Sequence, residues 1–241
     1  PLVLDVQDFE KCSQEFRVPA DYHGGAGTAI YVEKVLEHYV AWKLLELESD
    51  ARQPYIDVAA CASPWAKLLR DAGYESFAID LAPNEAYSDL PYYEEQDATR
   101  TRFLSESIGS ASLQCAFEMF SGPQDTQLIH ELARVLKPGG RALIAPLYMH
   151  THACYYQSPE FAGRVEGDVG ATGYIRRGCW GVPSSRKYSY ATLLERVWRP
   201  SQEVGLFPEI KVIRNAGDIH PNAYLHFVLV LSKANQLSES A

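Results

Sequence analysis

Several features that mark particular classes of protein are missing from this 241-residue sequence. No apolar run is long enough to cross a bilayer, which takes about 20 residues. No basic segment followed by an apolar run opens the sequence, so it shows no secretory signal. The 5 cysteines are odd in number and widely spaced, which favours neither a disulfide framework nor a zinc site. We therefore expect a cytoplasmic protein with reduced thiols, no membrane contact and no metal.

Basic residues are too few and too scattered to form an extended positive surface. The sequence holds 22 Lys and Arg against 31 Asp and Glu, a formal net charge of -9. Because binding to a phosphate backbone needs clustered Lys and Arg, we expect no nucleic-acid partner. The apolar fraction of 46% is that of an ordinary globular protein. The length suits one α/β domain, and we expect a monomer or homodimer that acts on a small molecule.

Alternating helical and extended patterns predict the fold. The expected elements are a helix over 28–47 capped by Thr28, strands over 54–60 and 76–82 with a helix over 63–73 between them, a short strand before Glu94, an extended stretch over 111–120, a helix over 125–137 ended by Pro138 and two glycines, and a strand over 141–149. Such alternation predicts a mostly parallel sheet with helices on both faces. The segments 208–215 and 224–232 leave no room for a helix between them, so they should pair as an antiparallel edge. We expect one domain over 1–241, with an N-terminal helical segment over 1–50.

Segment 148–188 breaks this pattern. It is rich in Tyr, His, Trp, Gly and Arg and shows no clear periodicity. A long insertion of this kind is more often a lid or binding element than a passive loop. We expect it to cover the ligand crevice, with Tyr148, Trp180 and Arg186 contacting the substrate. Packing of a structural excursion is the alternative, since Tyr and Trp are also ordinary half-buried residues.

Acidic residues follow successive strands of the predicted sheet. Asp57 ends the first strand, Asp80 ends the second, Asp97 follows the short third strand, and Glu118 lies at the end of the fourth. Ligands of open parallel sheets bind at these carboxyl ends, where a carboxylate can accept hydrogen bonds from ribose hydroxyls. An Asp at a strand end is also a common turn residue or helix cap. Each acid alone therefore supports either interpretation, and their order along the chain favours a nucleoside-bearing ligand.

In this order the sequence resembles the class I S-adenosylmethionine-dependent methyltransferases, over roughly residues 50 to 150. The stretch "YIDVAACAS" stands where that family has its glycine-rich first motif, "FAIDL" where it has its ribose-binding acid, and "EEQDAT" where it has its adenine-side acid. "ELARVLKPGG" is similar to the family's helix and turn before the fifth strand. "LQCAFEMFSG" and "IAPLYMHTH" resemble a bacterial branch with a type 11 methyltransferase domain. The resemblance implies a Rossmann-like fold, an enzyme and S-adenosylmethionine as cofactor.

The resemblance also implies a set of cofactor-binding residues. It places the ribose beside the acid at the second strand end, the adenine beside the third, and the methionine part on the first-strand loop; the residues are Asp57, Ala59, Ala60, Cys61, Asp80, Leu81, Asp97, Ala98 and Phe117. In the loop after the first strand, Ala59, Cys61 and Ser63 replace the usual glycines. Where the backbone there is left-handed, a side chain costs about 1–2 kcal/mol. The glycine-rich "HGGAGT" stretch, with Gly25, either closes over the methionine carboxylate or only shapes a turn.

Methyl transfer to a hydroxyl gains from a base near the acceptor. Glu118, His150 and His152 follow strand ends and are the candidate catalytic residues. Aromatic rings with hydroxyls in the expected lid suit a small polar acceptor, so we expect O-methylation of a small molecule such as a sugar.

Two other functions remain to be weighed. A nicotinamide-dependent oxidoreductase should show G-x-G-x-x-G after its first strand, and this sequence has none. A catalytically inactive methyltransferase-like interaction module is supported by the missing glycines and opposed by the ordered acids and by the aromatic insertion.

Overall fold

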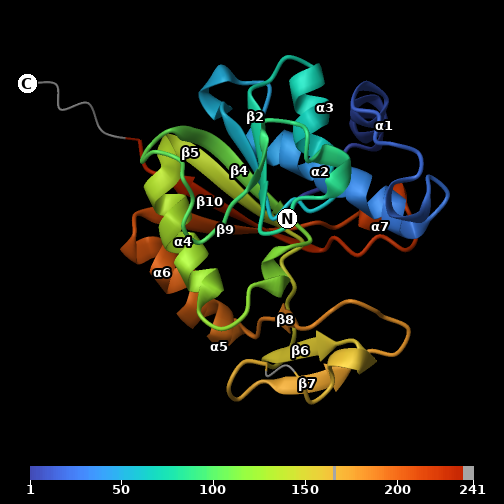
Figure 1. Ribbon diagram of the computed structural model, residues 1–241, viewed down its shortest axis with the longest axis vertical. Helices are drawn as coiled ribbons and strands as arrows, with labels where there is room; N and C mark the ends of the chain where they lie inside the picture. The colour runs from blue at the N-terminus through green and yellow to red at the C-terminus, as the bar shows by residue number, and fades with distance from the viewer. Residues whose placement is uncertain (165–166, 236–241) are drawn as a thin grey trace, which may run out of the picture.

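A seven-stranded sheet in the order β3-β2-β1-β4-β5-β10-β9 forms the centre of the computed structural model, which describes residues 1–164 and 167–235 (Figure 1). Its strands are β1 (Tyr55–Val58), β2 (Ser76–Asp80), β3 (Tyr93–Glu95), β4 (Ile108–Gln114), β5 (Leu136–Ala145), β9 (Leu206–Val212) and β10 (Phe227–Lys233). The first five strands pair in parallel, and β10 runs antiparallel to both β5 and β9. The predicted fold class, with its antiparallel edge, is confirmed.

Helices cover both faces of this sheet (Figure 1). One face carries α1 (Val6–Glu15), α2 (Ala29–Leu45), α3 (Trp65–Asp71) and α7 (Ala216–Ile219); the other carries α4 (Gln124–Val135), α5 (Tyr190–Leu193), the π-helical turn η6 (Leu194–Trp198) and α6 (Arg199–Glu203). Single turns of 3-10 helix are η1 (Tyr22–Gly24), η2 (Asp50–Arg52), η3 (Glu85–Tyr87), η4 (Phe117–Met119) and η5 (Pro159–Phe161). Alternation along β5 supplies both cores, because Leu143 packs with the α2 side and Ile144 with the α4 side. No helix in the described ranges is both long and apolar enough to span a membrane.

Local sequence signals explain where the helices beside the site begin. Thr28 caps α2, its hydroxyl accepting a hydrogen bond from the Tyr31 N–H at 3.1 Å. The Ser63 hydroxyl accepts from the N–H of Trp65 at 3.3 Å at the start of α3. Thr28 and Ser63 therefore determine where α2 and α3 begin.

Two predicted boundaries and one predicted connection are wrong. β4 ends at Gln114, and the following residues form the turn η4 instead of more strand. Helix α4 ends at Val135, so Pro138 and its glycines lie inside β5, with a register shift against β4. A side chain at Gly140 would meet the Lys137 carbonyl at 2.8 Å, which explains the need for glycine at this close approach. A single helical turn, α7, also fits between β9 and β10.

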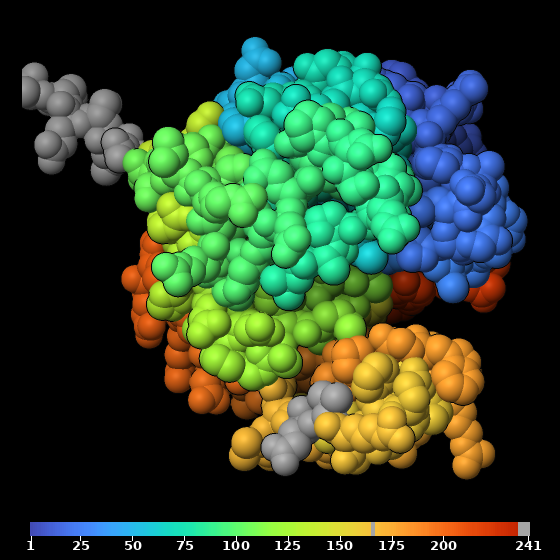
Figure 2. All heavy atoms as spheres, in the orientation of Figure 1, coloured from blue at the N-terminus to red at the C-terminus, as the bar shows by residue number. Residues whose placement is uncertain are grey.

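The insertion over 148–188 forms a second, three-stranded sheet, where the sequence predicted an irregular segment. Its order is β7-β6-β8, with β6 (Cys154–Gln157), β7 (Thr172–Ile175) and β8 (Ser185–Lys187). This lid sheet is a lobe at one end of the main domain (Figures 1 and 2). Its two ends meet, because the Tyr188 N–H donates to the Tyr148 carbonyl at 2.9 Å and the His150 N–H donates to the Tyr188 carbonyl at 2.8 Å.

Candidate active site

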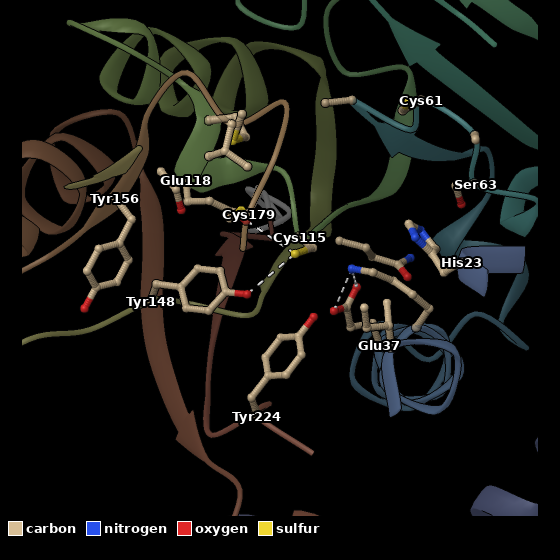
Figure 3. A pocket seen from close by; sticks show the side chains of 18 of the residues that line it. His23, Glu37, Cys61, Ser63, Cys115, Glu118, Tyr148, Tyr156, Cys179 and Tyr224 are labelled. Carbon is tan, nitrogen blue, oxygen red and sulfur yellow. Dashed lines mark hydrogen bonds and ion pairs between the residues drawn. The ribbon is translucent and has the colours of Figure 1, made fainter. Parts of the chain in front are cut away.

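A cavity of about 920 Å³ lies between the carboxyl ends of β1 and β4, helix α2 and the lid sheet (Figure 3). The loop after β1 lines one end, and side chains from the lid line the other. This is the place that an open α/β sheet offers to a ligand. The insertion therefore contributes to the wall of the crevice, as a lid should.

The loop after β1 keeps the backbone shape of a glycine-rich loop without glycine. Ala59 has φ 54° and Cys61 has φ 46°, both in the left-handed region. The Cys61 N–H donates to the Asp80 carboxylate at 2.8 Å, and the Tyr93 hydroxyl donates to the Ser63 carbonyl at 2.7 Å. The predicted strain is present, and contacts to β2 and β3 hold the loop in place.

Asp57 lies buried at the base of this loop. The Ser63 hydroxyl donates to its Oδ2 at 2.6 Å, which ties the end of the loop back to β1. Burial raises the pKa of Asp57 to about 7, although the hydrogen bond from Ser63 opposes the shift. The carboxyl group therefore titrates close to neutral pH.

The other predicted cofactor residues lie beside the cavity, outside its lining. Both oxygens of Asp80 accept backbone hydrogen bonds, from Cys61 and Ala82. Leu81 is exposed, Ala98 is buried in the core, and Asp97 accepts from the backbone and hydroxyl of Thr99. A carboxylate has about four acceptor sites, so these bonds leave Asp80 able to accept from a ribose.

The Phe117 side chain corrects the sequence prediction. It is 2% exposed and stacks on Tyr188 in the core, with ring centroids 5.7 Å apart. Its ring is committed to packing, so it does not flank a cofactor base in this conformation. Gly25 also lies outside the cavity lining, whereas its neighbours Tyr22 and His23 line it.

Buried polar side chains on one face of α2 line the cavity, and the sequence analysis did not predict them. The Lys34 ammonium donates to both carboxylate oxygens of Glu37, at 3.0 and 2.9 Å. Burial opposes the charge on Lys34, but the Glu37 carboxylate outweighs it and raises the pKa of Lys34. His38 stacks on Trp65 and contacts Gln114 through Nδ1. The available signal was the polar set at positions 33, 34, 37 and 38 of an otherwise apolar helix, a spacing that defines one face.

The turn after β4 places Glu118, a predicted catalytic residue, in the lining of the cavity. The Cys115 thiol donates to Glu118 Oε1 at 3.3 Å and lies 3.5 Å from the Tyr148 hydroxyl (Figure 3). Among the described residues, Glu118 Oε2 is buried without a hydrogen-bond partner. Cys115 has φ 55°, so the chain turns sharply here to aim η4 at the cavity. An unpartnered buried carboxylate oxygen is costly unless a ligand supplies a donor.

Aromatic and cationic groups line the lid end. Tyr148 and Trp180, both predicted, contribute to the wall, together with Tyr156, Lys187 and Tyr224. The Lys187 ammonium lies 3.2 Å from the centroid of the Tyr148 ring. Burial lowers the pKa of Lys187 to about 8, with Glu118 opposing the shift.

The structure gives Arg186 a different place from the predicted one. Its guanidinium pairs with Asp168 and, at 2.7 Å, with Asp125, and it donates to the Gly122 carbonyl at 2.9 Å. It is 4% exposed and fastens the lid to α4, away from the main cavity. His150 lines the cavity, whereas His152 lies just outside it, against Tyr174.

Residues 56–144 match the family model of a methyltransferase domain. No curated protein matches the sequence. Among solved structures, the chain is similar to the Burkholderia thailandensis 1,6-didemethyltoxoflavin-N1-methyltransferase, at 12% identity and a TM-score of 0.56, over 98% of this chain and 92% of that one. It is also similar to an S-adenosylmethionine dependent methyltransferase from Mesorhizobium loti, at 13% identity and a TM-score of 0.54, over 80% of this chain and 98% of that one.

The neighbours show the fold, and the matched domain gives the class. Residues 56–144 are a methyltransferase domain within a Rossmann-like fold, and the enzyme uses S-adenosylmethionine as its cofactor. The predicted resemblance to methyltransferases and the predicted enzyme class are therefore confirmed. The bacterial branch and the roles of individual site residues remain predictions.

Proposed function

We propose that the protein transfers the methyl group of S-adenosylmethionine to an oxygen atom of a small polar molecule, such as a sugar. The observation that carries this proposal is the single cavity shared by the loop after β1 and the lid. Its volume of about 920 Å³ lies in the range of small-molecule sites and leaves no room for a nucleic-acid duplex. Its lid end mixes tyrosine rings with a carboxylate and an ammonium, which suits an acceptor that carries hydroxyls.

The residues on the cofactor side fit the methionine and ribose parts of S-adenosylmethionine. Small side chains at Ala59, Ala60 and Cys61 leave the backbone of the loop accessible, and Asp80 offers acceptors for ribose hydroxyls. S-adenosylmethionine supplies an already activated methyl group, so the protein mainly has to align the acceptor with it.

Glu118 is the group best placed to accept the acceptor's proton. Its Oε2 has no partner among the described residues, and its position at the end of β4 lies between the cofactor loop and the lid. Tyr148 and Lys187 line the same end of the cavity as Glu118, where they can orient hydroxyl or anionic groups of the acceptor. The left-handed loop at Ala59 and Cys61 weakens the case for an inactive module, because the binding conformation persists without glycine.

Release of S-adenosylhomocysteine across a panel of acceptors tests the substrate class. The panel holds sugars, polyols, phenols, amines, a structured RNA and an unfolded protein at matched concentrations. We expect turnover with a hydroxyl-bearing small molecule and identification of an O-methyl product by mass spectrometry. Turnover only with RNA, protein or an amine would contradict the proposal.

A lid replacement tests where the acceptor binds. We expect a short glycine linker in place of residues 151–186 to preserve S-adenosylhomocysteine affinity and to abolish transfer. A shortened protein that still methylates the same acceptor at the wild-type rate would remove the lid from substrate binding.

A further inference from the structure

Three metal-ligating side chains come together where the chain enters the lid. His150, His152 and Cys154 stand at every second position, across a bend at Thr151 and His152 that leads into β6. One ligand atom from each lies within 4.8 Å of the others. The two histidine rings stand edge to face at 4.4 Å, and the cysteine is buried.

The surroundings hold these side chains in place. His152 Nε2 lies 2.9 Å from the Tyr174 hydroxyl on β7, and Nδ1 of the same ring, 3.3 Å from the exposed Thr151 hydroxyl, is the atom that would act as a ligand. A metal-binding histidine usually donates its second ring N–H to such a partner. Strand pairing in the lid sheet fixes Cys154 between β7 and β8. Only side-chain rotations are then needed to gather the three donor atoms.

We propose that His150, His152 and Cys154 bind a Zn²⁺ ion at the lid end of the cavity. Two imidazoles and a thiolate form a ligand set suited to Zn²⁺, whereas Mg²⁺ and Ca²⁺ need oxygen ligands. Zn–N distances near 2.0 Å and Zn–S near 2.3 Å place tetrahedral ligands about 3.3–3.6 Å apart, so the three atoms must close by roughly 1 Å.

The proposed site has three protein ligands and one open position. His150 lines the cavity, so the open position faces the space assigned to the acceptor. Three protein ligands and an exchangeable fourth are the pattern of zinc sites that contact substrate. We expect the open fourth position to bind a hydroxyl of the acceptor, and this expectation rests on the proposed function. Lys187, paired with Cys154 in the lid sheet, adds a positive charge, so the affinity should be lower than that of a closed four-ligand site.

Metal titration tests the site without any acceptor, so its outcome is separate from that of the activity screen. Chelator-treated full-length protein is titrated with ZnCl₂ by calorimetry and with CoCl₂ by absorption spectroscopy. We expect one equivalent of Zn²⁺ to bind and Co²⁺ to show a thiolate charge-transfer band. Each of the variants His152→Ala and Cys154→Ser should lose at least about 10-fold in affinity, and Cys154→Ser should lose the band.

Matched controls separate this site from other thiols and imidazoles. Exposed His130 on α4 and Cys179 in the cavity wall provide the variants His130→Ala and Cys179→Ser, which should bind Zn²⁺ like the wild type. Thermal unfolding of the metal-free variants checks that they fold, and Zn²⁺ should raise the Tm of the wild type but not that of Cys154→Ser. No stoichiometric binding to the wild type, or loss of binding in Cys179→Ser but not in Cys154→Ser, would overturn the proposal.

Discussion

The two ends of the cavity are built in different ways. At the cofactor end, the loop after β1 forms part of the wall, and its side chains from Ala59 to Ser63 are small. At the lid end, large side chains such as Tyr148, Tyr156 and Lys187 form the wall. Strand ends of a parallel sheet fix the first wall, since their position follows from the fold. The second wall depends on the side chains of one insertion, so it can set the acceptor without altering the cofactor end.

Glu118→Gln gives the largest expected effect and acts at the boundary between the two ends. Loss of the proton acceptor should lower turnover by about 10²–10⁴-fold. S-adenosylhomocysteine affinity should remain close to that of the wild type, because the cofactor wall is unchanged. Steady-state kinetics together with calorimetry give both quantities. Exposed Glu95 on β3 provides the control Glu95→Gln, and equal rates for both variants would remove Glu118 from catalysis.

Asp57→Asn should change the pH dependence of stability from within the cofactor end. Burial raises the folded pKa of Asp57 to about 7, whereas an unfolded Asp titrates near 3.9. The folded protein therefore holds this proton more tightly. The resulting stabilisation is complete below about pH 4 and is lost as the pH rises through about 7, by up to about 1.4 kcal/mol per pH unit.

Urea unfolding of the cofactor-free proteins measures this effect. Between about pH 4 and pH 7, we expect the wild type to lose stability relative to Asp57→Asn, whose amide stays neutral, and the difference should level off above about pH 7. Exposed Asp71 gives the control Asp71→Asn, whose profile should follow the wild type. Parallel profiles for wild type and Asp57→Asn would show that Asp57 has an ordinary pKa.

Asp80→Asn tests whether Asp80, at the carboxyl end of β2, binds the ribose of the cofactor. Removal of the charged acceptor should weaken S-adenosylhomocysteine binding by about 1.5–3 kcal/mol, roughly 10- to 150-fold, because hydrogen bonds to charged groups contribute that much. The amide oxygen still accepts from Cys61, so the loop should keep its conformation. Calorimetry against Asp71→Asn provides the comparison, and unchanged affinity would refute the ribose assignment.

Ala59→Gly and Cys61→Gly should give the smallest effect. Both positions are left-handed, so glycine relieves about 1–2 kcal/mol of strain but adds freedom to the unfolded chain. We expect a net rise of about 0.5–1 kcal/mol in the free energy of unfolding, measured with urea. Ala62, which lacks a positive φ, supplies the control Ala62→Gly, which should destabilise. Loss of stability in all three variants would mean that the loop tolerates its side chains without strain.

The sheet and the cofactor end could be predicted from sequence because local signals determine them. Strand periodicity, the Thr28 cap and the acids after successive strands each depend on a few neighbouring residues. The order of those acids places them at one edge of the sheet without any knowledge of packing. The side chain of Phe117 could not be predicted in the same way, because its partner Tyr188 lies far away in sequence.

The lid end could not be predicted residue by residue for the same reason. Arg186 lies among the aromatic residues of the insertion, which made it a candidate substrate contact, yet its guanidinium forms ion pairs with Asp125 on α4 and with Asp168. Lys187, the next residue, points to the cavity instead, because successive side chains of a strand face opposite sides. The register of β8 decides between the two, and that register depends on long-range pairing with β6.

The lid leaves and re-enters the main domain at a single point, the paired backbone of Tyr148, His150 and Tyr188. The insertion is one continuous segment of the polypeptide, and its two ends are adjacent in space. Insertions of this kind are tolerated because they separate no strands of the host. On the proposed function, a related methyltransferase domain that receives residues 151–186 in one exchange should gain the acceptor preference of this lid and keep its own cofactor-binding residues.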